Sequence, residues 1–510
     1  MIRNVKAIPK MITVLLLFQL SLVVNAQYQT EKSDMGTDYY LNPIFAGDYP
    51  DPSIIRDGDT YYMVHSSFEY YPGLLIWQSK DLINWAPVTN ALHKYIGSVW
   101  APDLVKYGDH YYVYFPASDS IYVVAAESIS GPWSDPVNLK IRSIDPGHVV
   151  DEKGNRYLYF SNGSFVPLAK DGLSVTGQMI DVYDGWPIPR DWTIECFCLE
   201  GPKLTKHGDY YYLTVAEGGT AGPATSHMIV SARSKSVFGP WENSPYNPVL
   251  RTRDSSERWW SVGHGTLFDD TAGKWWMIFH GYENGYYNKG RQTLMLPVEW
   301  TDDGWFKLPE TSEIVKPQKR PAGTIQEAGY SVSDDFDGNT LKPQWKFFGE
   351  YDTTRFNMVD NSLVIKAKGR SVSHSSPLLT VPLDHSYTAQ VELTMEGNAI
   401  GGLVLFYNDN YYSGILADRK NILANLRGWQ FPTERNVIQG HVFLRLVNIN
   451  NTVDMYYSLN GMDWTKIENS LQVTAFHHNV LSGFMSLRIG LCSIGNGKVT
   501  FDNFVYEPVK

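Results

Sequence analysis

The stretch "GDTYYMVHSS" at residues 58–67 sets the pattern from which the fold can be predicted. It opens with a glycine and a polar residue and continues into alternating aromatic and aliphatic residues, which is typical of a tight turn leading into a half-buried strand. The pattern returns in four further segments, "GDHYYVYFPA" from 108, "GNRYLYFSN" from 154, "GDYYYLTVAE" from 208 and "GKWWMIFHG" from 273. Their starts are 50, 46, 54 and 65 residues apart, a spacing typical of four-stranded blades. The sequence therefore predicts an all-β fold with a five-bladed β-propeller.

Each of the five segments is preceded by a polar residue that has proline or glycine as a neighbour. These residues are Asp51 in "YPDPS", Asp103 in "WAPDL", Asp145 in "SIDPG", Glu200 in "CLEGP" and His264 in "GHGTL". All lie five to nine residues before the glycine of their segment, where the innermost strand of a blade would begin. Because the innermost strands surround the axis of a propeller, we expect the five side chains to converge at one mouth.

Carboxylates gathered in this way would have separated pKa values, because burial and like charges oppose the ionisation of some of them. One protonated and one ionised carboxyl are what glycoside hydrolysis requires. A structural interpretation stands beside this one, since an aspartate next to proline is often only a turn former. It is favoured for Asp103, whereas the repeated placement disfavours it for Asp51, Asp145 and Glu200. For His264 three roles stay open: a buried structural histidine, a ligand to an axial water or cation, and a substrate contact.

The charge and the aromatic content of the chain narrow the classes of ligand that it is expected to bind. The formal net charge is −11, which argues against nucleic acid or an anionic membrane surface and favours a neutral partner such as an oligosaccharide or polysaccharide. The 16 Trp, 33 Tyr and 22 Phe residues suit both a β-rich fold and the stacking of sugar rings.

Residues 1–26 have the order of a secretory signal peptide: basic residues, the apolar run "MITVLLLFQLSLVV" and a small residue before the expected cleavage site. The apolar run is short for a membrane span, and no later segment is apolar enough to cross a membrane. The sequence therefore predicts an exported protein, periplasmic or extracellular. The three cysteines, Cys196, Cys198 and Cys492, are too few and too oddly spaced for a disulfide framework or a zinc site, and are interpreted as small apolar fillers.

The character of the chain changes after the fifth segment. Residues 27–314 are assigned to the propeller, and residues 315–329 are rich in proline, glycine and polar residues, as a linker would be. Residues 330–510 contain short runs that alternate apolar with polar residues, which predicts an antiparallel β-sandwich.

Five motifs over about residues 42–308 together resemble glycoside hydrolase family 43. They are "YPDPSIIRDGDTYYMVHSSFEYYPG", "VWAPDLVKYGDHYYVYF", "SIDPGHVVDEKGNRYLYF", "LEGPKLTKHGDYYYLTVAEGGT" and "GRQTLMLPVEW". The resemblance implies a five-bladed propeller enzyme of the group that includes β-xylosidases, α-L-arabinofuranosidases and arabinanases. It also implies an inverting mechanism, with Asp51 as general base, Glu200 as general acid, and Asp145 as the carboxylate that orients Glu200 and tunes its pKa.

The same resemblance suggests substrate contacts from Phe68, Trp100 and Arg291. It places His264 near the axis, where some members of the family hold a calcium or sodium ion. Two features depart from the family pattern: Lys203 stands where many members have histidine, and "CFCLEGP" is an unusual approach to Glu200.

The C-terminal part resembles the concanavalin-like accessory domain that follows the propeller in a subset of the family. Asp335, Asp337 and Asp502 could share a calcium ion there, although solvated turn acids are an equal alternative. The chemistry itself is expected to need no cofactor.

The sequence thus predicts an exported inverting glycosidase that removes terminal xylose or arabinofuranose. Chain-end action is expected because the second domain and the insert at residues 182–197 could wall off one side of the mouth. A propeller that only binds glycans would be expected to lack one of the three carboxylates, and a protein scaffold would need none of them. A family member specific for galactofuranose stays open, whereas a retaining fructan hydrolase is disfavoured because "YPDPS" is not its nucleophile motif.

Overall fold

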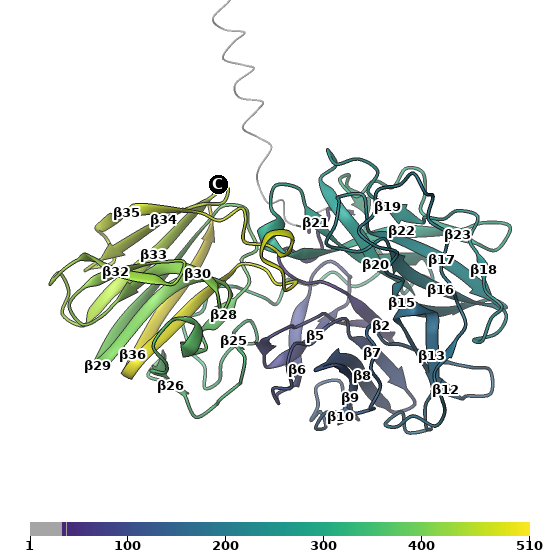
Figure 1. Cartoon of the computed structure of the whole chain (residues 1–510), viewed down its shortest axis with the longest axis horizontal. Helices are drawn as coiled ribbons and strands as arrows, with labels where there is room; N and C mark the ends of the chain where they lie inside the picture. Colours follow the sequence, from purple (N-terminus) through teal and green to yellow (C-terminus); the bar gives the residue numbers. More distant parts are fainter. Residues whose placement is uncertain (1–32, 37, 510) are drawn as a thin grey trace, which may run out of the picture.

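The structure, a computed structural model, describes residues 33–36 and 38–509, so the predicted signal peptide lies outside the described residues. The fold is all-β, and its two parts lie side by side: a propeller and a β-sandwich that carries the C-terminus (Figure 1). This confirms the predicted fold class. Among the described residues, no helix has the length and apolar character needed to cross a bilayer.

The propeller consists of five antiparallel sheets within the described residues, and each sheet follows the order of the sequence. Their strands are β2 (Ser53–Asp57), β3 (Thr60–Val64), β5 (Gly73–Ser79) and β6 (Ala86–Leu92); β7 (Asp103–Tyr107), β8 (His110–Ala117), β9 (Ser120–Ala126) and β10 (Val137–Asn138); β11 (Gly147–Val150), β12 (Arg156–Phe160), β13 (Ser164–Pro167) and β14 (Ile180–Asp181); β15 (Glu200–His207), β16 (Tyr210–Glu217), β17 (Met228–Ser234), β18 (Glu242–Asn243) and β19 (Leu250–Arg251); and β20 (Trp259–Asp269), β21 (Trp275–Glu283), β22 (Arg291–Trp300) and β23 (Phe306–Lys307). The first strands of the sheets neighbour one another, and β20 contacts both β15 and β2. The ring of blades is thereby closed around an axis.

The repeated segments form the second strand of each blade, as their alternation predicts. In the first blade, Asp57 pairs with Thr60 across the turn, and Gly58 has the positive φ of 64° that this tight turn needs. Tyr61 and Met63 are fully buried against residues of the last blade, so the alternating side chains fill the space between neighbouring sheets.

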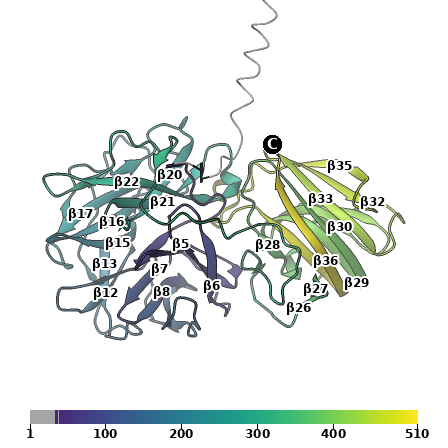
Figure 2. The same cartoon turned by 180° about the vertical axis from the view of Figure 1, so that it is seen from behind.

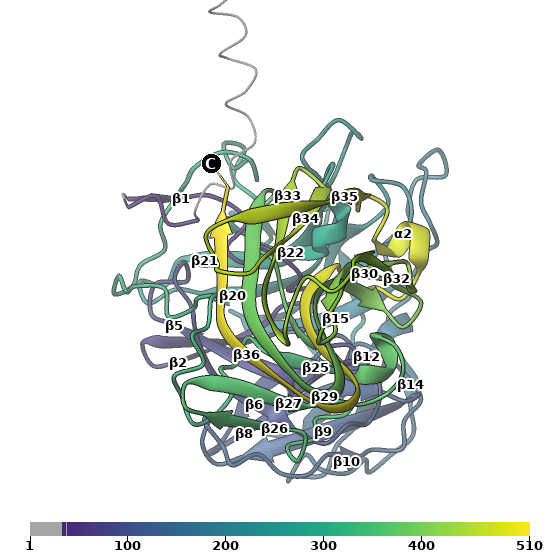
Figure 3. The same cartoon turned by 90° about the vertical axis from the view of Figure 1, so that its left-hand side faces the viewer.

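The sandwich is organised around two long strands, β29 (Tyr387–Asn408) and β36 (Arg488–Pro508), which pair along almost their whole length. They cross the middle of Figure 3 as two curved ribbons. The remaining strands of this domain are β25 (Lys346–Phe348), β26 (Phe356–Val359), β27 (Ser362–Lys366), β28 (Leu378–Thr380), β30 (Tyr411–Ala417), β31 (Ile422–Leu426), β32 (Trp429–Glu434), β33 (His441–Ile449), β34 (Thr452–Ser458) and β35 (Trp464–Gln472). Short helical turns occur at η1 (Ser161–Gly163), η2 (Tyr287–Lys289), η3 (Ser373–Ser375) and α2 (His478–Leu481).

The two domains share backbone pairing and buried charges. Strand β4 (Tyr70–Tyr71), from the first blade, pairs with β25 of the sandwich. Figure 2 shows from behind how the two domains meet. A buried ion pair between Asp48 and Arg488, at 3.3 Å, also crosses the boundary. In the expected linker, β24 (Gln318–Lys319) pairs with β1 (Tyr39–Tyr40), so this segment packs along the propeller.

Residues 473–487, which connect β35 to β36 and contain α2, form what we call the capping loop. This loop leaves the sandwich and contacts two blades of the propeller: the Leu487 N–H donates to the carbonyl of Asn288 at 2.9 Å, and the Asn479 amide donates to the carbonyl of Gly222 at 3.5 Å. The sandwich therefore contributes residues to the propeller surface at this point.

Candidate active site

The first strands of the blades bring the expected side chains to the axis. Asp51 and Asp145 lie just before β2 and β11, Glu200 is the first residue of β15, and His264 lies within β20. Asp51, Asp145 and His264 have left-handed backbones, with φ values of 56°, 54° and 55°. Such conformations cost roughly 1–3 kcal/mol for residues other than glycine and persist where the surrounding structure imposes them. Their recurrence in three blades marks this end of the axis as a candidate site.

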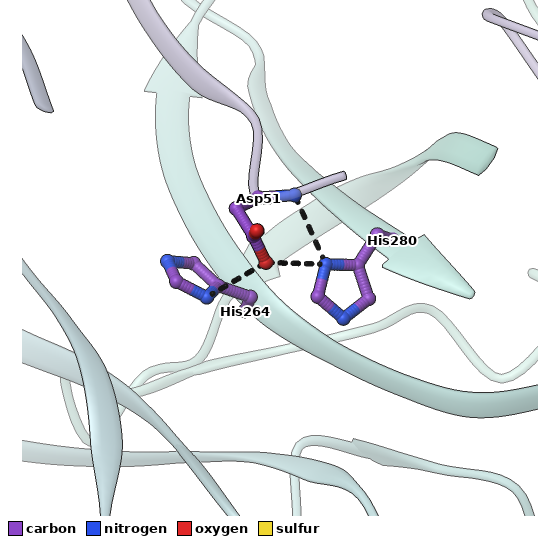
Figure 4. Close-up of side chains that lie close together, drawn as sticks. All are labelled: Asp51, His264 and His280. Carbon is purple, nitrogen blue, oxygen red and sulfur yellow. Dashed lines mark hydrogen bonds and ion pairs between the residues drawn. The ribbon is translucent and has the colours of Figure 1, made fainter. Parts of the chain in front are cut away.

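Asp51 is 4% exposed and is surrounded by polar partners. Its Oδ1 lies 2.8 Å from Arg291 Nη1, and its Oδ2 accepts a hydrogen bond from Ser66 Oγ at 2.6 Å. His264 and His280 flank the carboxylate, with their Nδ1 atoms 3.4 and 3.1 Å from Oδ1 (Figure 4). His280 Nδ1 also accepts the backbone N–H of Asp51 at 3.1 Å. The carboxylate is thus fixed at both oxygens.

Burial alone would raise the pKa of Asp51, but the charge of Arg291 opposes this effect, and the pKa is held well below its usual range. Burial lowers the pKa of both histidines, which are therefore neutral near pH 7. Asp51 is ionised across the working range of most enzymes and can accept a proton.

Glu200 has the opposite electrostatics. Burial, followed by the negative charges of Asp145 and Asp51, raises its pKa well above the usual range. Burial and the charge of Asp51 also raise the pKa of Asp145, to about 7. The Glu200 side chain keeps 21% of its surface exposed, so a protonated carboxyl here can reach a ligand in the mouth.

Asp145 acts on the backbone next to Glu200. Its Oδ2 accepts the N–H of Gly201 at 3.0 Å and a longer hydrogen bond from Ser161 at 3.5 Å. Because Gly201 directly follows Glu200, this contact fixes the backbone from which the Glu200 side chain projects. The arrangement suits the positioning role that the resemblance implied.

Asp103 has a structural environment, as the sequence interpretation favoured. Its carboxylate lies 2.6 Å from Lys203 Nζ and accepts hydrogen bonds from Ser53 Oγ at 3.2 Å and from the backbone N–H of His148 at 2.7 Å. The three partners come from three other blades, so four blades meet at this carboxylate. The lysine that departs from the family pattern therefore supplies the countercharge of a buried clamp between blades.

The expected substrate contacts differ in exposure. Phe68 is buried, with its ring centroid 6.0 Å from the Arg291 guanidinium, whereas Trp100 is 39% exposed. The Trp100 ring lies 6.3 Å from Phe484 of the capping loop, and Phe484 in turn lies 5.4 Å from the Arg291 guanidinium. An aromatic side chain of the sandwich thus stands beside the group that holds Asp51.

Sequence reasoning missed three residues at the site: Phe484, His227 and His280. His280 is the last residue but one of the repeated segment "GKWWMIFHG", so its place next to the axis could have been found from the blade pattern. His227 is buried, with Nε2 3.6 Å from Glu200 Oε1, and no motif marks it. Phe484 is nearly two hundred residues beyond the last blade, and nothing in its local sequence predicts where the loop folds.

The axial cation that the resemblance suggested does not fit these residues well. Asp51, His264 and His280 could present three ligand atoms within 4.8 Å of one another. Calcium prefers six to eight oxygen ligands, whereas this set offers one carboxylate and two imidazoles. The carboxylate is already paired with Arg291, whose charge would repel a cation. We therefore derive no step through an ion.

The predicted set of calcium ligands in the sandwich is wrong for Asp502. Asp335 and Asp337 lie close to Asp334 instead of Asp502, and Lys342 Nζ lies 2.8 to 3.3 Å from all three carboxylates. Asp502 is in β36 and accepts a hydrogen bond from Ser362 in the neighbouring strand. The ammonium group supplies the positive charge that a cation would otherwise provide.

The interpretation of the cysteines is also wrong in part. Cys196 and Cys198 form a disulfide, while Cys492 is a buried free thiol in the sandwich. Two cysteines separated by one residue were not expected to pair, because the count was odd and no framework was apparent. The disulfide lies two residues before Glu200.

Residues 40–306, which carry every propeller side chain described above, match the family model described as glycosyl hydrolases family 43. The chain belongs to glycosyl hydrolase family 43. The enzyme is thus a glycoside hydrolase, as the resemblance implied. Residues 333–507 match the concanavalin A-like C-terminal domain of β-xylosidases, so both domains of the family 43 enzyme are accounted for.

Relatives of the family 43 enzyme align over nearly its whole length. It is 29% identical to a non-reducing-end α-L-arabinofuranosidase of Bacteroides ovatus over 514 aligned residues, covering 90% of this chain and 92% of the relative. It is 28% identical to a xylan 1,3-β-xylosidase of a Vibrio species, covering 85% and 91% of the two chains. The solved structure of the family 43 protein BlXynB of Bacillus licheniformis superposes with a TM-score of 0.84 at 27% identity, covering 92% of this chain and all of that chain.

Proposed function

We propose that this enzyme is an exported, inverting glycosidase that releases terminal xylose or arabinofuranose residues from plant-type polysaccharides or oligosaccharides. The observation that carries the proposal is the opposite environment of two carboxyls at one mouth: Asp51 is paired with Arg291, which holds its pKa low, whereas burial and the nearby carboxylates raise the pKa of Glu200. Similarity to enzymes named for arabinofuranose and for xylose supports the choice of these two sugars.

The reaction that this pair supports is a single displacement. Asp51 accepts a proton from a water molecule while the water oxygen attacks the anomeric carbon. The glycosidic bond breaks, and Glu200 transfers its proton to the departing oxygen. The products are one sugar with inverted configuration and the rest of the substrate, which now ends in a hydroxyl group. Before the next turnover, Asp51 loses its proton and Glu200 takes one up.

Arg291 stabilises the ionised form of Asp51, the base in this scheme. Its guanidinium keeps Asp51 ionised, and burial prevents water from weakening that interaction. The low pKa of Asp51 makes it a weak base, so we assign its contribution mainly to holding the water in line and accepting the proton as the bond to carbon forms.

The capping loop supports action at chain ends. It contacts residues before β17 and after β21, and Phe484 stands near both Trp100 and Arg291. A mouth covered in this way accepts the end of a chain more readily than its middle. Export is proposed from residues 1–26, and the Cys196–Cys198 disulfide is in keeping with an oxidising compartment.

Chain-end action predicts that single sugars are the first products. We expect monosaccharide to accumulate from the earliest time points when arabinan or xylan is digested, without a phase of mid-length oligosaccharides. A parallel screen of aryl β-D-xyloside, α-L-arabinofuranoside and β-D-galactofuranoside identifies the sugar. The Phe484→Ala variant should bind the preferred aryl glycoside more weakly, whereas Phe431→Ala, on β32 of the sandwich, should not. Mid-length oligosaccharides as first products would instead indicate an open cleft.

A further inference from the structure

The segment that leads into Glu200 is hydrogen-bonded to residues 218–226 of the same chain. The N–H of Glu195 donates to the carbonyl of Gly218 at 3.1 Å, and the N–H of Gly218 donates to the carbonyl of Phe197 at 2.9 Å. Ser226 Oγ also accepts the Glu195 N–H at 2.7 Å. The disulfide between Cys196 and Cys198 lies inside this segment. It therefore links the backbone just before Glu200 to residues that these hydrogen bonds hold in place.

Glu200 itself has few other constraints. Within the described part of the chain its carboxyl makes no side-chain hydrogen bond, and its one ion-pair contact, with His227 Nε2 at 3.6 Å, is too long to be one. The pairing of β15 with β16 is irregular between Glu200 and Lys203, so the strand ladder alone does not fix the register there. The direction of the side chain must therefore come from the backbone on either side.

The backbone on the N-terminal side of Glu200 is strained. Cys198 has a φ of 41°, in the left-handed region that residues other than glycine, asparagine and aspartate seldom adopt. An uncrosslinked chain would gain by relaxing this residue to a right-handed or extended conformation, which would rotate the two residues that follow. The link to Cys196 opposes this relaxation because it joins the side chains on either side of Phe197.

We infer that the Cys196–Cys198 disulfide is a positioning element for Glu200, so that proton donation to the leaving group depends on the oxidised form of the enzyme. The inference rests on the proposed role of Glu200 as the general acid. Reduction by a dithiol would break the sulfur–sulfur bond and supply two electrons and two protons, giving two cysteine thiols while the dithiol becomes a cyclic disulfide. The reverse exchange would restore the link.

The test compares the oxidised enzyme, the enzyme reduced by a dithiol, and the variant Cys196→Ser/Cys198→Ser. The substrates are an alkyl glycoside, which needs protonation of its leaving group, and a dinitrophenyl glycoside of the same sugar, which does not. We expect kcat/KM for the alkyl glycoside to fall about tenfold or more in the reduced and double-serine forms, with less than about a twofold loss for the dinitrophenyl glycoside, because general acid assistance is typically worth about 10²–10⁴-fold. Reoxidation should restore the reduced enzyme.

Two controls make the result specific. Cys492→Ala should respond to the dithiol as the unmodified enzyme does, because its thiol is buried in the other domain. Mass spectrometry of the tryptic peptide of residues 191–203 should show a mass two hydrogens lower before reduction than after it.

A peptide that already has two thiols, an unchanged kcat/KM after proven reduction, or equal losses on both substrates would each overturn the inference. If the oxidised enzyme cleaved neither glycoside, the proposed function would fail, and the inference would fail with it.

Discussion

Asp51→Asn is expected to abolish hydrolysis of every glycoside, whatever its leaving group. The amide keeps the shape of the side chain but cannot accept a proton from water, and general base assistance is typically worth about 10²–10⁴-fold. The loss should appear in kcat/KM for alkyl and dinitrophenyl glycosides alike. Because no leaving group can replace an absent base, the size of the loss should not vary across the series.

Asp57→Asn provides a matched control. Asp57 ends the same strand that follows Asp51, and it pairs with Lys106 at the protein surface, 2.6 Å away. We expect its activity to stay within about twofold of the unmodified enzyme, because a surface ion pair contributes little to stability. Substantial hydrolysis by Asp51→Asn, with the fold intact by circular dichroism, would remove Asp51 from the role of base.

Glu200→Gln is expected to depend strongly on the leaving group. A general acid matters only as far as the departing oxygen needs a proton, so cleavage of alkyl glycosides should fall by about 10²–10⁴-fold while dinitrophenyl glycosides are largely spared. The measurement is kcat/KM over aryl glycosides of graded phenol acidity. Equal losses at both ends of the series would exclude Glu200 as the acid and direct attention to another carboxyl, such as Glu217.

The pH profile provides a second readout for Glu200. Because its pKa is raised, the protonated form persists at pH values where an ordinary glutamate is ionised, and activity should fall as pH rises through this pKa. This alkaline limb should disappear in Glu200→Gln assayed with dinitrophenyl substrate.

Asp145→Asn should resemble Glu200→Gln in its dependence on the leaving group. It should keep the alkaline limb but shift it to lower pH, because the charge of Asp145 helps to raise the pKa of Glu200.

The fold could be predicted from the sequence because each blade repeats one local pattern. The glycine turn of residues 58–67 and its four counterparts specify strand, turn and register without reference to distant residues. The three carboxylates could be found for the same reason, since Asp51, Asp145 and Glu200 each occupy one place in the repeated unit.

Other features of the site could not be found in this way, because they depend on contacts between distant segments. Phe484 reaches the mouth from the second domain, and His227 gains its significance only from its closeness to Glu200. The Cys196–Cys198 pairing depends on a backbone conformation at Cys198 that no propensity favours. The sequence predicts that Asp335 lies near Asp502, whereas in the structure Asp335 belongs to a local cluster around Lys342.

The configuration of the first sugar released tests the central claim most directly. Proton NMR recorded within the first minutes of hydrolysis, before the anomers interconvert, distinguishes the two outcomes. If Asp51 activates water and Glu200 protonates the leaving group, the newly formed anomer will have the configuration opposite to that of the substrate. A first product with the configuration of the substrate would mean that a carboxylate attacks the sugar as a nucleophile, and it would contradict the assignment of Asp51 as the base.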